Sequence, residues 1–283
     1  MCNINILIKN NQKLKHHPNT IAAFIDATAN SFACNSDAEG FYISKSKILR
    51  KSVWRLNMLS KLPTMLDSDM LIDHTRISTS GFTEHNTQPF KRGRFIISHN
   101  GILNFHGKYP DKDKSDTAVF CDILMTRYKE RNNIGDAISE VIAKDISSGS
   151  YSIAIYDEVD NILYYFKNYS TSFWVHETTN YTFMSTMKTN SVFFSDTFKS
   201  HEPKPNQLYR FSYVKGVLNV DNAELPIPKY AANIPYNNSN KWHSPTPAYP
   251  ARGCVPSAKA QTRETIIHHD NYYGGLYDRF GDY

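Results

Sequence analysis

Five runs rich in apolar and aromatic residues occupy the segment from Ser150 to Val220, and they limit the possible folds more than any other feature of the sequence. Runs of this length, separated by polar residues, are typical of β-strands. Helical patterns lie earlier in the chain and do not alternate one for one with strands. This order predicts an α+β fold of layered sheets and helices rather than a series of βαβ units. The five runs are YSIAIYD, ILYYFKN, SFWVHE, YTFMST and LYRFSYV.

Periodicity and capping signals place the earlier elements. Polar and apolar side chains alternate at the start of the chain, which predicts a strand. An asparagine cap is expected for a helix that begins at Pro18 or Asn19, and Ser115 or Asp116 is expected to start a second helix. The expected helices cover residues 18–32, 115–131 and 134–146. The expected strands cover residues 2–8, 69–79, 93–103 and the segment after Gly40.

The composition changes after about Leu225. The following segment is rich in proline, asparagine and tyrosine and has no sustained periodicity. Residues 2–225 are therefore expected to form one folded domain, and residues 226–283 a largely irregular tail. The aromatic end of the tail, NYYGGLYDRFGDY, is an alternative candidate for a docking motif.

Charge and composition exclude several classes of protein. The 283 residues carry a formal net charge of +5, and no run approaches the roughly 18 apolar residues that cross a membrane. The first residues are too polar for a signal peptide, so a cytoplasmic protein without membrane contacts is expected. The basic segment 45–55 lacks a recognition motif, which predicts a solvated surface and no nucleic-acid partner. The histidines lack the spacing of a zinc site, so neither a metal nor another cofactor is expected.

The four cysteines show no C-x-x-C spacing, as is usual in a reducing compartment. Cys34 and Cys121 have apolar neighbours and are expected in the core. Cys2 differs because removal of Met1 would give it a free α-amine beside its thiol. Reference pKa values near 7.7–8.0 for the amine and 8.5 for the thiol make the pair a base and a nucleophile near neutral pH.

Two segments carry groups that suit recognition of a small zwitterion. The strand ending at Arg76 is followed by a loop of serine, threonine and glycine, and a guanidinium can hold a carboxylate by two parallel hydrogen bonds. Asp116, at the start of a helix, can cap that helix or can receive an ammonium group. The neighbouring loop residues expected to contribute hydroxyl and backbone groups are Ser78, Thr79 and Gly81.

The stretch FIISHNGILNFH, residues 95–106, places Asn100 and Gly101 between two apolar runs. Asn-Gly is a strong signal for a two-residue hairpin, because both residues tolerate the positive φ of a type I′ turn. An asparagine amide and a glycine N–H can also act as two donors toward one oxyanion. The sequence permits either interpretation, or a tight turn that also presents both donors.

Together, Cys2, the segment HTRISTSG…NTQPF, SHNGIL and SDT strongly resemble the class II glutamine amidotransferases, the N-terminal-nucleophile (Ntn) glutaminases. NSDAEGFYI, residues 35–43, is also similar to that family's Asp-x-x-Gly segment, and the resemblance covers roughly residues 2–220. It implies a four-layer αββα sandwich and three catalytic residues: Cys2 as nucleophile, and Asn100 and Gly101 as the oxyanion hole. It also implies that Arg76 binds the α-carboxylate of glutamine and Asp116 its α-ammonium group.

The resemblance therefore implies an enzyme that releases ammonia from glutamine through a γ-glutamyl thioester. Relatives usually carry a second domain that consumes the ammonia, so a separate synthetase is the expected partner here. Hydrolysis of another γ-glutamyl amide is an alternative within the same chemistry. An alternative of another class is a non-catalytic binding protein that docks a partner through its tail.

Overall fold

The computed structural model describes residues 2–77, 84–107, 113–194 and 199–227. Within these residues the strands form two sheets with antiparallel pairing. Sheet A has the order β11 (Lys199–His201), β9 (Trp174–Glu177), β10 (Tyr181–Ser185), β1 (Asn3–Lys9), β4 (Met70–Arg76), β2 (Ala38–Ile43) and β3 (Ile48–Ser52). Sheet B has the order β13 (Val217–Glu224), β12 (Gln207–Val214), β8 (Ile162–Lys167), β7 (Ile146–Asp157), β6 (Phe95–Phe105) and β5 (Phe90–Arg92).

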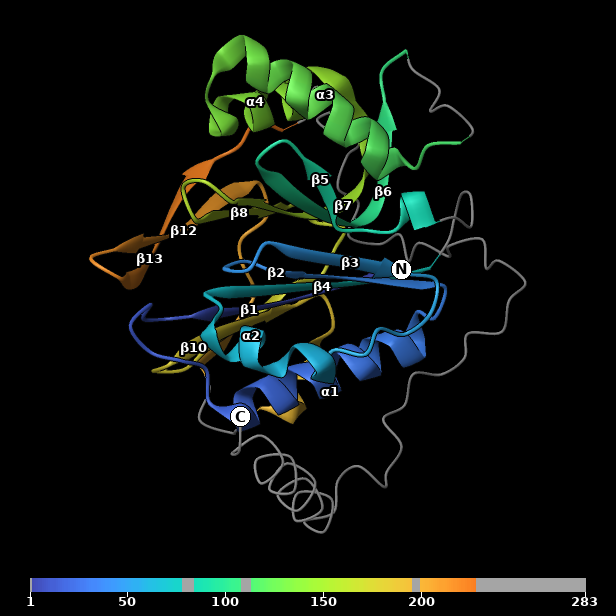
Figure 1. Cartoon of the computed structure of the whole chain (residues 1–283). Helices are drawn as coiled ribbons and strands as arrows, with labels where there is room; N and C mark the ends of the chain where they lie inside the picture. The colour runs from blue at the N-terminus through green and yellow to red at the C-terminus, as the bar shows by residue number, and fades with distance from the viewer. Residues whose placement is uncertain (1, 78–83, 108–112, 195–198, 228–283) are drawn as a thin grey trace, which may run out of the picture. The chain divides into compact units, whose positions relative to one another are not determined.

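Helices cover the outer face of each sheet, as Figure 1 shows. Helices α1 (Pro18–Cys34) and α2 (Leu62–Asp67) pack on sheet A through one apolar cluster, which includes Leu7 and Phe24. Helices α3 (Asp116–Arg131) and α4 (Ile134–Glu140) pack on sheet B through a second cluster, which includes Ile97. A third cluster joins the two sheets and includes Ile4 and Ile96. The α+β class predicted from the sequence is therefore confirmed.

Neighbouring residues of the central strands face different clusters, as expected for β-strands. In β1, Ile6 packs between the sheets, as Ile4 does, whereas Leu7 packs under α1. In β6, Ile96 packs between the sheets whereas Ile97 packs under α3 and α4. This alternation determines which side chains at the ends of these strands can face one another.

Local chemistry explains how the two long helices begin. Pro18 is the first residue of α1, and the N-cap is His17, whose Nδ1 accepts a hydrogen bond from Asn19 N at 3.2 Å. The predicted asparagine cap is therefore wrong. Ser115 caps α3 by accepting from Ala118 N at 3.2 Å, which leaves Asp116 as the first helical residue.

Other sequence predictions have mixed outcomes. The helix expected around 134–146 ends at Glu140 and continues as a π-helical turn over Val141–Asp145. Cys121 is fully buried, as expected, but Cys34 is half-buried and disulfide-bonded, so its prediction as a free core thiol is wrong. No helix in the described ranges is long and apolar enough to cross a membrane. Residues 228–283, most of the predicted tail, lie outside the described residues.

A buried polar network connects β1 to α1 through Asn5. The Asn5 side-chain amide donates to Ser31 Oγ at 2.9 Å and to Asp73 Oδ2 at 3.0 Å. Ser185 and Asn190 each donate to Asn5 Oδ1 at 2.8 Å. Asp73 is fully buried, so this network holds a carboxyl group in the core beside the strand that follows Cys2.

Asp73→Asn is expected to change how stability depends on pH. Burial, and next the nearby Glu39 carboxylate, raise the pKa of Asp73 well above its usual value. The folded protein then keeps a proton that the unfolded chain loses above about pH 4, so the free energy of unfolding falls as pH rises from there toward the folded pKa. The variant should be more stable than wild type at pH 7, with a smaller difference near pH 4, in urea unfolding at each pH.

Glu224→Gln is the control for this experiment because Glu224 is exposed at the end of β13. Its unfolding midpoint should follow wild type across the pH range. Some pH dependence should remain in Asp73→Asn, since burial also raises the pKa of Glu39. Equal stability of Asp73→Asn and wild type at both pH values would contradict the prediction.

Candidate active site

The start of β1 and the end of β4 bring Cys2 next to Arg76. The antiparallel pairing of Asn3 with Thr75 places the residues just beyond them, Cys2 and Arg76, side by side at the edge of the pairing. Both continue the series of side chains that face sheet B, because Ile4 and Ile72 belong to the cluster between the sheets. The two predicted site residues of sheet A therefore share one face.

Burial determines the ionisation of both groups. Burial raises the pKa of the Cys2 thiol, which donates to Ile77 O at 3.7 Å; the Arg76 guanidinium lowers this pKa and the Asp116 carboxylate raises it. Burial also lowers the pKa of Arg76, whereas Cys2, Asp37 and Asp116 raise it. Cys2, Arg76 and Asp116 therefore lie within electrostatic range of one another.

Sheet B contributes the edge of β6 to this region. Strand β5 pairs with β6 only from Phe95 to Ile97, so no strand of the described residues lies on that side of the following part of β6. Side chains accept from the amides there instead: Gln88 Oε1 from His99 N at 2.6 Å and Asp116 Oδ2 from Leu103 N at 2.8 Å. Amides of alternate strand residues point to the same side. The N–H of Gly101, midway between these two, therefore faces the same open edge.

Gly101 adopts a conformation that other residues rarely adopt. Its φ is +138°, and a Cβ atom on it would lie 1.9 Å from Ser150 O. Asn100 and Gly101 pair with Ser152 and Tyr151 of β7 in the middle of a long strand. The interpretation of this dipeptide as a hairpin turn is therefore wrong. The interpretation as a turn that also presents two donors to an oxyanion is wrong for the same reason. The glycine is required by the close approach of β7.

The Asn100 side chain faces the space between the sheets. It follows Ile96 and Ser98 in the strand's alternation, and Ile96 packs in the cluster between the sheets. Asn100 is 4% exposed, and its side chain makes no hydrogen bond to any described residue. An unpaired buried amide is costly, typically about 1–3 kcal/mol, so its position favours a bound polar group.

Other buried polar atoms near Asn100 also lack a partner in the described part of the chain. They are Ser98 Oγ and His74 Nδ1, which face the space between the sheets as Asn100 does. Burial lowers the pKa of His74 to about 3 and also lowers that of His99, so both rings are neutral at physiological pH. A concentration of unpaired polar atoms at one end of the inter-sheet space is typical of a site for a polar ligand.

Asp116 combines a structural and an electrostatic role. Its Oδ1 accepts from Thr117 N at 2.7 Å and its Oδ2 from Leu103 N, which joins the start of α3 to the edge of β6. The side chain remains partly exposed. The helix cap is Ser115, so the interpretation of Asp116 as the cap is wrong, and its carboxylate acts electrostatically on Arg76 and Cys2.

The remaining predicted binding residues, Ser78, Thr79 and Gly81, lie outside the described residues. Sequence analysis did not single out Gln88, His74 or Thr117, although all three lie in quoted motifs. No metal-binding cluster of histidine, cysteine or acidic residues occurs among the residues described.

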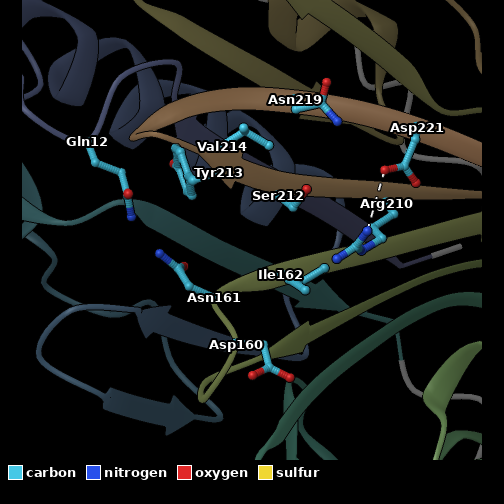
Figure 2. Close-up of a pocket in the computed structure, with 10 residues that line it drawn as sticks. All are labelled: Gln12, Asp160, Asn161, Ile162, Arg210, Ser212, Tyr213, Val214, Asn219 and Asp221. Carbon is cyan, nitrogen blue, oxygen red and sulfur yellow. Dashed lines mark ion pairs between the residues drawn. The ribbon is translucent and has the colours of Figure 1, made fainter.

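A separate polar pocket of about 370 Å³ is shown in Figure 2. Gln12, Asn161, Arg210 and Asp221 are among its lining residues. Gln12 follows the end of β1 and Cys2 precedes its start, so the pocket and the candidate site lie at opposite ends of that strand.

Comparisons with known proteins support the fold. No protein-family model and no curated protein matches this chain. The glutamine phosphoribosylpyrophosphate amidotransferase from B. subtilis, complexed with ADP and GMP, is similar at a TM-score of 0.57 and 12% identity, over 79% of this chain and 49% of that chain. A structure of the allosteric regulatory enzyme of purine biosynthesis is similar at a TM-score of 0.57 and 13% identity, over 80% of this chain and 50% of that chain.

This chain thus spans about half the length of both solved structures. At this level of identity the likeness concerns the fold. It confirms that the chain folds like a glutamine amidotransferase, as the sequence resemblance implied.

Proposed function

We propose that this protein hydrolyses the side-chain amide of glutamine, with Cys2 as an N-terminal nucleophile. The observation that supports the proposal is the edge of β6 beyond the pairing with β5, together with the buried Asn100 side chain, which faces the space between the sheets as Cys2 and Arg76 do. Two donors opposite a thiol form the arrangement that acyl transfer requires. The amidotransferase-like fold supports the same reaction class.

In this mechanism Met1 is removed and the α-amine of Cys2 acts as the base. Because burial raises the thiol pKa, the thiol is protonated at neutral pH and needs that base. The sulfur attacks the amide carbon, and the oxyanion accepts hydrogen bonds from Asn100 Nδ2 and Gly101 N. The protonated amine then gives its proton to the departing ammonia, and water hydrolyses the γ-glutamyl thioester.

The charged groups match the backbone of a free amino acid. Arg76 would hold the α-carboxylate and Asp116 the α-ammonium group, with Ser78, Thr79 and Gly81 as further contacts. The opposite charges of Arg76 and Asp116, each acting on Cys2, support a zwitterionic substrate with its reactive amide at the thiol. On this proposal the two sheets and their helices form the αββα sandwich of the Ntn hydrolases.

The test is release of ammonia and glutamate from glutamine, compared with a panel of γ-glutamyl amides. The proposal requires glutamine to have the highest kcat/KM. If another γ-glutamyl compound ranks first, the chemistry is retained and the substrate differs. Absence of turnover for the whole panel, with a mature N-terminal cysteine, would favour the non-catalytic alternative. Affinity capture with a carboxyl-terminal tag tests whether a separate synthetase receives the ammonia.

Arg76→Lys is expected to weaken substrate binding. Lysine keeps the charge but loses the two-pronged geometry that holds a carboxylate. Hydrogen bonds to a charged group contribute about 1.5–3 kcal/mol, so KM for glutamine should rise about 10–100-fold with a smaller change in kcat. Steady-state glutamate release measures both constants.

Arg94→Lys is the matched control, because Arg94 forms ion pairs with Asp157 and Asp160 away from the site. Its KM should equal that of wild type. An unchanged KM in Arg76→Lys would remove Arg76 from the proposed substrate contacts.

A further inference from the structure

Four buried residues connect the two sheets next to Asn100, and we call them the column. They are Gln88, Thr117, His74 and His99. Gly40 of β2 pairs with His74 of β4 in sheet A. The backbone of Gln88 packs against Gly40 so closely that a Cβ on the glycine would lie 1.8 Å from Gln88 O. The Gln88 side chain then reaches His99 of sheet B.

In this column the Gln88 side chain accepts the hydrogen bond from β6 that a neighbouring strand would otherwise accept. Its Oε1 accepts from His99 N at 2.6 Å, and its Nε2 donates to Thr117 Oγ1 at 3.1 Å. Thr117 Oγ1 also bonds to His99 Nδ1 at 2.9 Å. These three residues are at most 5% exposed, so each bond is shielded from competing water.

His74 hydrogen-bonds to the backbone carbonyl of His99, whereas Gln88 bonds to the backbone amide of the same residue. Its Nε2 donates to His99 O at 3.1 Å, across the gap between β4 and β6. The carbonyl of His99 and the amide of Asn100 belong to one rigid peptide plane. Side chains therefore fix the orientation of the backbone from which the Asn100 side chain and the Gly101 N–H project.

We infer that Gln88 and His74 are positioning residues that set the Asn100 and Gly101 donors relative to Cys2. The inference rests on the proposed function. His74 lies two residues before Arg76 on the strand beside Cys2, whereas His99 immediately precedes the donors. These side chains thus tie the nucleophile's sheet to the donors' sheet. Misplacement of reacting groups by about 1 Å can lower a rate about 10²-fold.

The test compares Gln88→Met and Thr117→Val with Thr117→Ser. Gln88→Met removes both hydrogen bonds at similar volume, and Thr117→Val removes only the hydroxyl. Both should lower kcat for glutamine about 10–100-fold and leave KM within about threefold, since Arg76 and Asp116 remain. Thr117→Ser keeps the hydroxyl and should restore most of kcat. His74→Leu should lower kcat. His74→Gln keeps a hydrogen-bond donor and should recover part of the lost kcat.

Gln207→Met, on β12 of sheet B, applies the same substitution at a glutamine outside the column and should leave kcat unchanged. If circular dichroism shows that Gln88→Met does not fold, the comparison of Thr117→Val with Thr117→Ser tests the inference instead. An active wild type with unchanged kcat in Thr117→Val and His74→Leu overturns the inference, as does a KM that rises in parallel with lost kcat. A wild type without turnover refutes the proposed function instead, which separates the two failures.

Discussion

Cys2→Ala is expected to abolish glutamate release from glutamine, by at least about 10⁴-fold, while the protein remains folded. Removal of a catalytic nucleophile leaves only the rate that binding and oxyanion stabilisation support. The fold should survive because Cys2 is half-buried and precedes β1, whose pairing with β4 begins at Asn3. Steady-state ammonia release and circular dichroism measure the two effects.

Cys121→Ala is the matched control for Cys2→Ala. Cys121 is a free, fully buried thiol on α3, and burial raises its pKa to about 12, so it is unreactive. Its replacement should lower stability by a modest amount without reducing kcat. Retention of full activity in Cys2→Ala would refute the nucleophile assignment.

The state of Met1 provides a second, independent check. The mechanism needs a free α-amine on Cys2, so the intact mass of the active protein must be lower by one methionine residue. A variant extended by a non-cleavable residue before Cys2 should be inactive, since its amide nitrogen cannot act as a base. Full turnover with Met1 retained would leave the thiol without the proposed base.

The sequence predicted the strands that carry the site because their periodicity is local. Alternation at the start of the chain corresponds to β1 and correctly implies that Ile4, Ile6 and Ile8 share a face, and the apolar run of DMLIDHTR that ends in polar residues corresponds to β4. Residue chemistry permitted Arg76 and Asp116 as ligands of a carboxylate and an ammonium group, and the family resemblance implied both roles. Their proximity to Cys2 arises from strand pairing, which periodicity does not specify.

The Asn-Gly signal shows where local reasoning fails. A positive φ at Gly101 was correctly implied by the dipeptide, but the favoured structure was a two-residue turn. The pairing of β6 with β7 continues past Gly101 as far as Phe105, and Ser150 O occupies the space that a side chain would need. Contacts between residues 49 positions apart in the chain, Gly101 and Ser150, thus decide the conformation.

The column behind Asn100 could not be predicted from the sequence for a related reason. Gln88 acts as a substitute for a strand only because β5 begins at Phe90, opposite Ile97, and so does not reach His99. The hydrogen bond between His74 and His99 also requires two sheets to meet face to face. Both depend on tertiary placement, whereas the residue types themselves are common in buried polar positions.

Asn100→Ala is expected to lower kcat for glutamine by about 10²–10³-fold and to change KM little. The Asn100 amide makes no hydrogen bond to a described residue, so its removal should create no unpaired group in the free protein. The proposed donor acts mainly on the oxyanion, and loss of one such donor typically costs 2.7–4 kcal/mol of transition-state stabilisation.

Asn104→Ala provides the control on the same strand. Asn104 is exposed and bonds to Ser148 Oγ at 3.0 Å, beyond the donor pair, so both kinetic constants should match wild type. Asn100→Asp adds a sharper comparison: it preserves shape but replaces a donor with an acceptor that repels the oxyanion, so its kcat should fall at least as far as that of Asn100→Ala. If KM rises while kcat is retained, Asn100 binds the ground state of the substrate, and the oxyanion hole must be sought elsewhere along the open edge of β6.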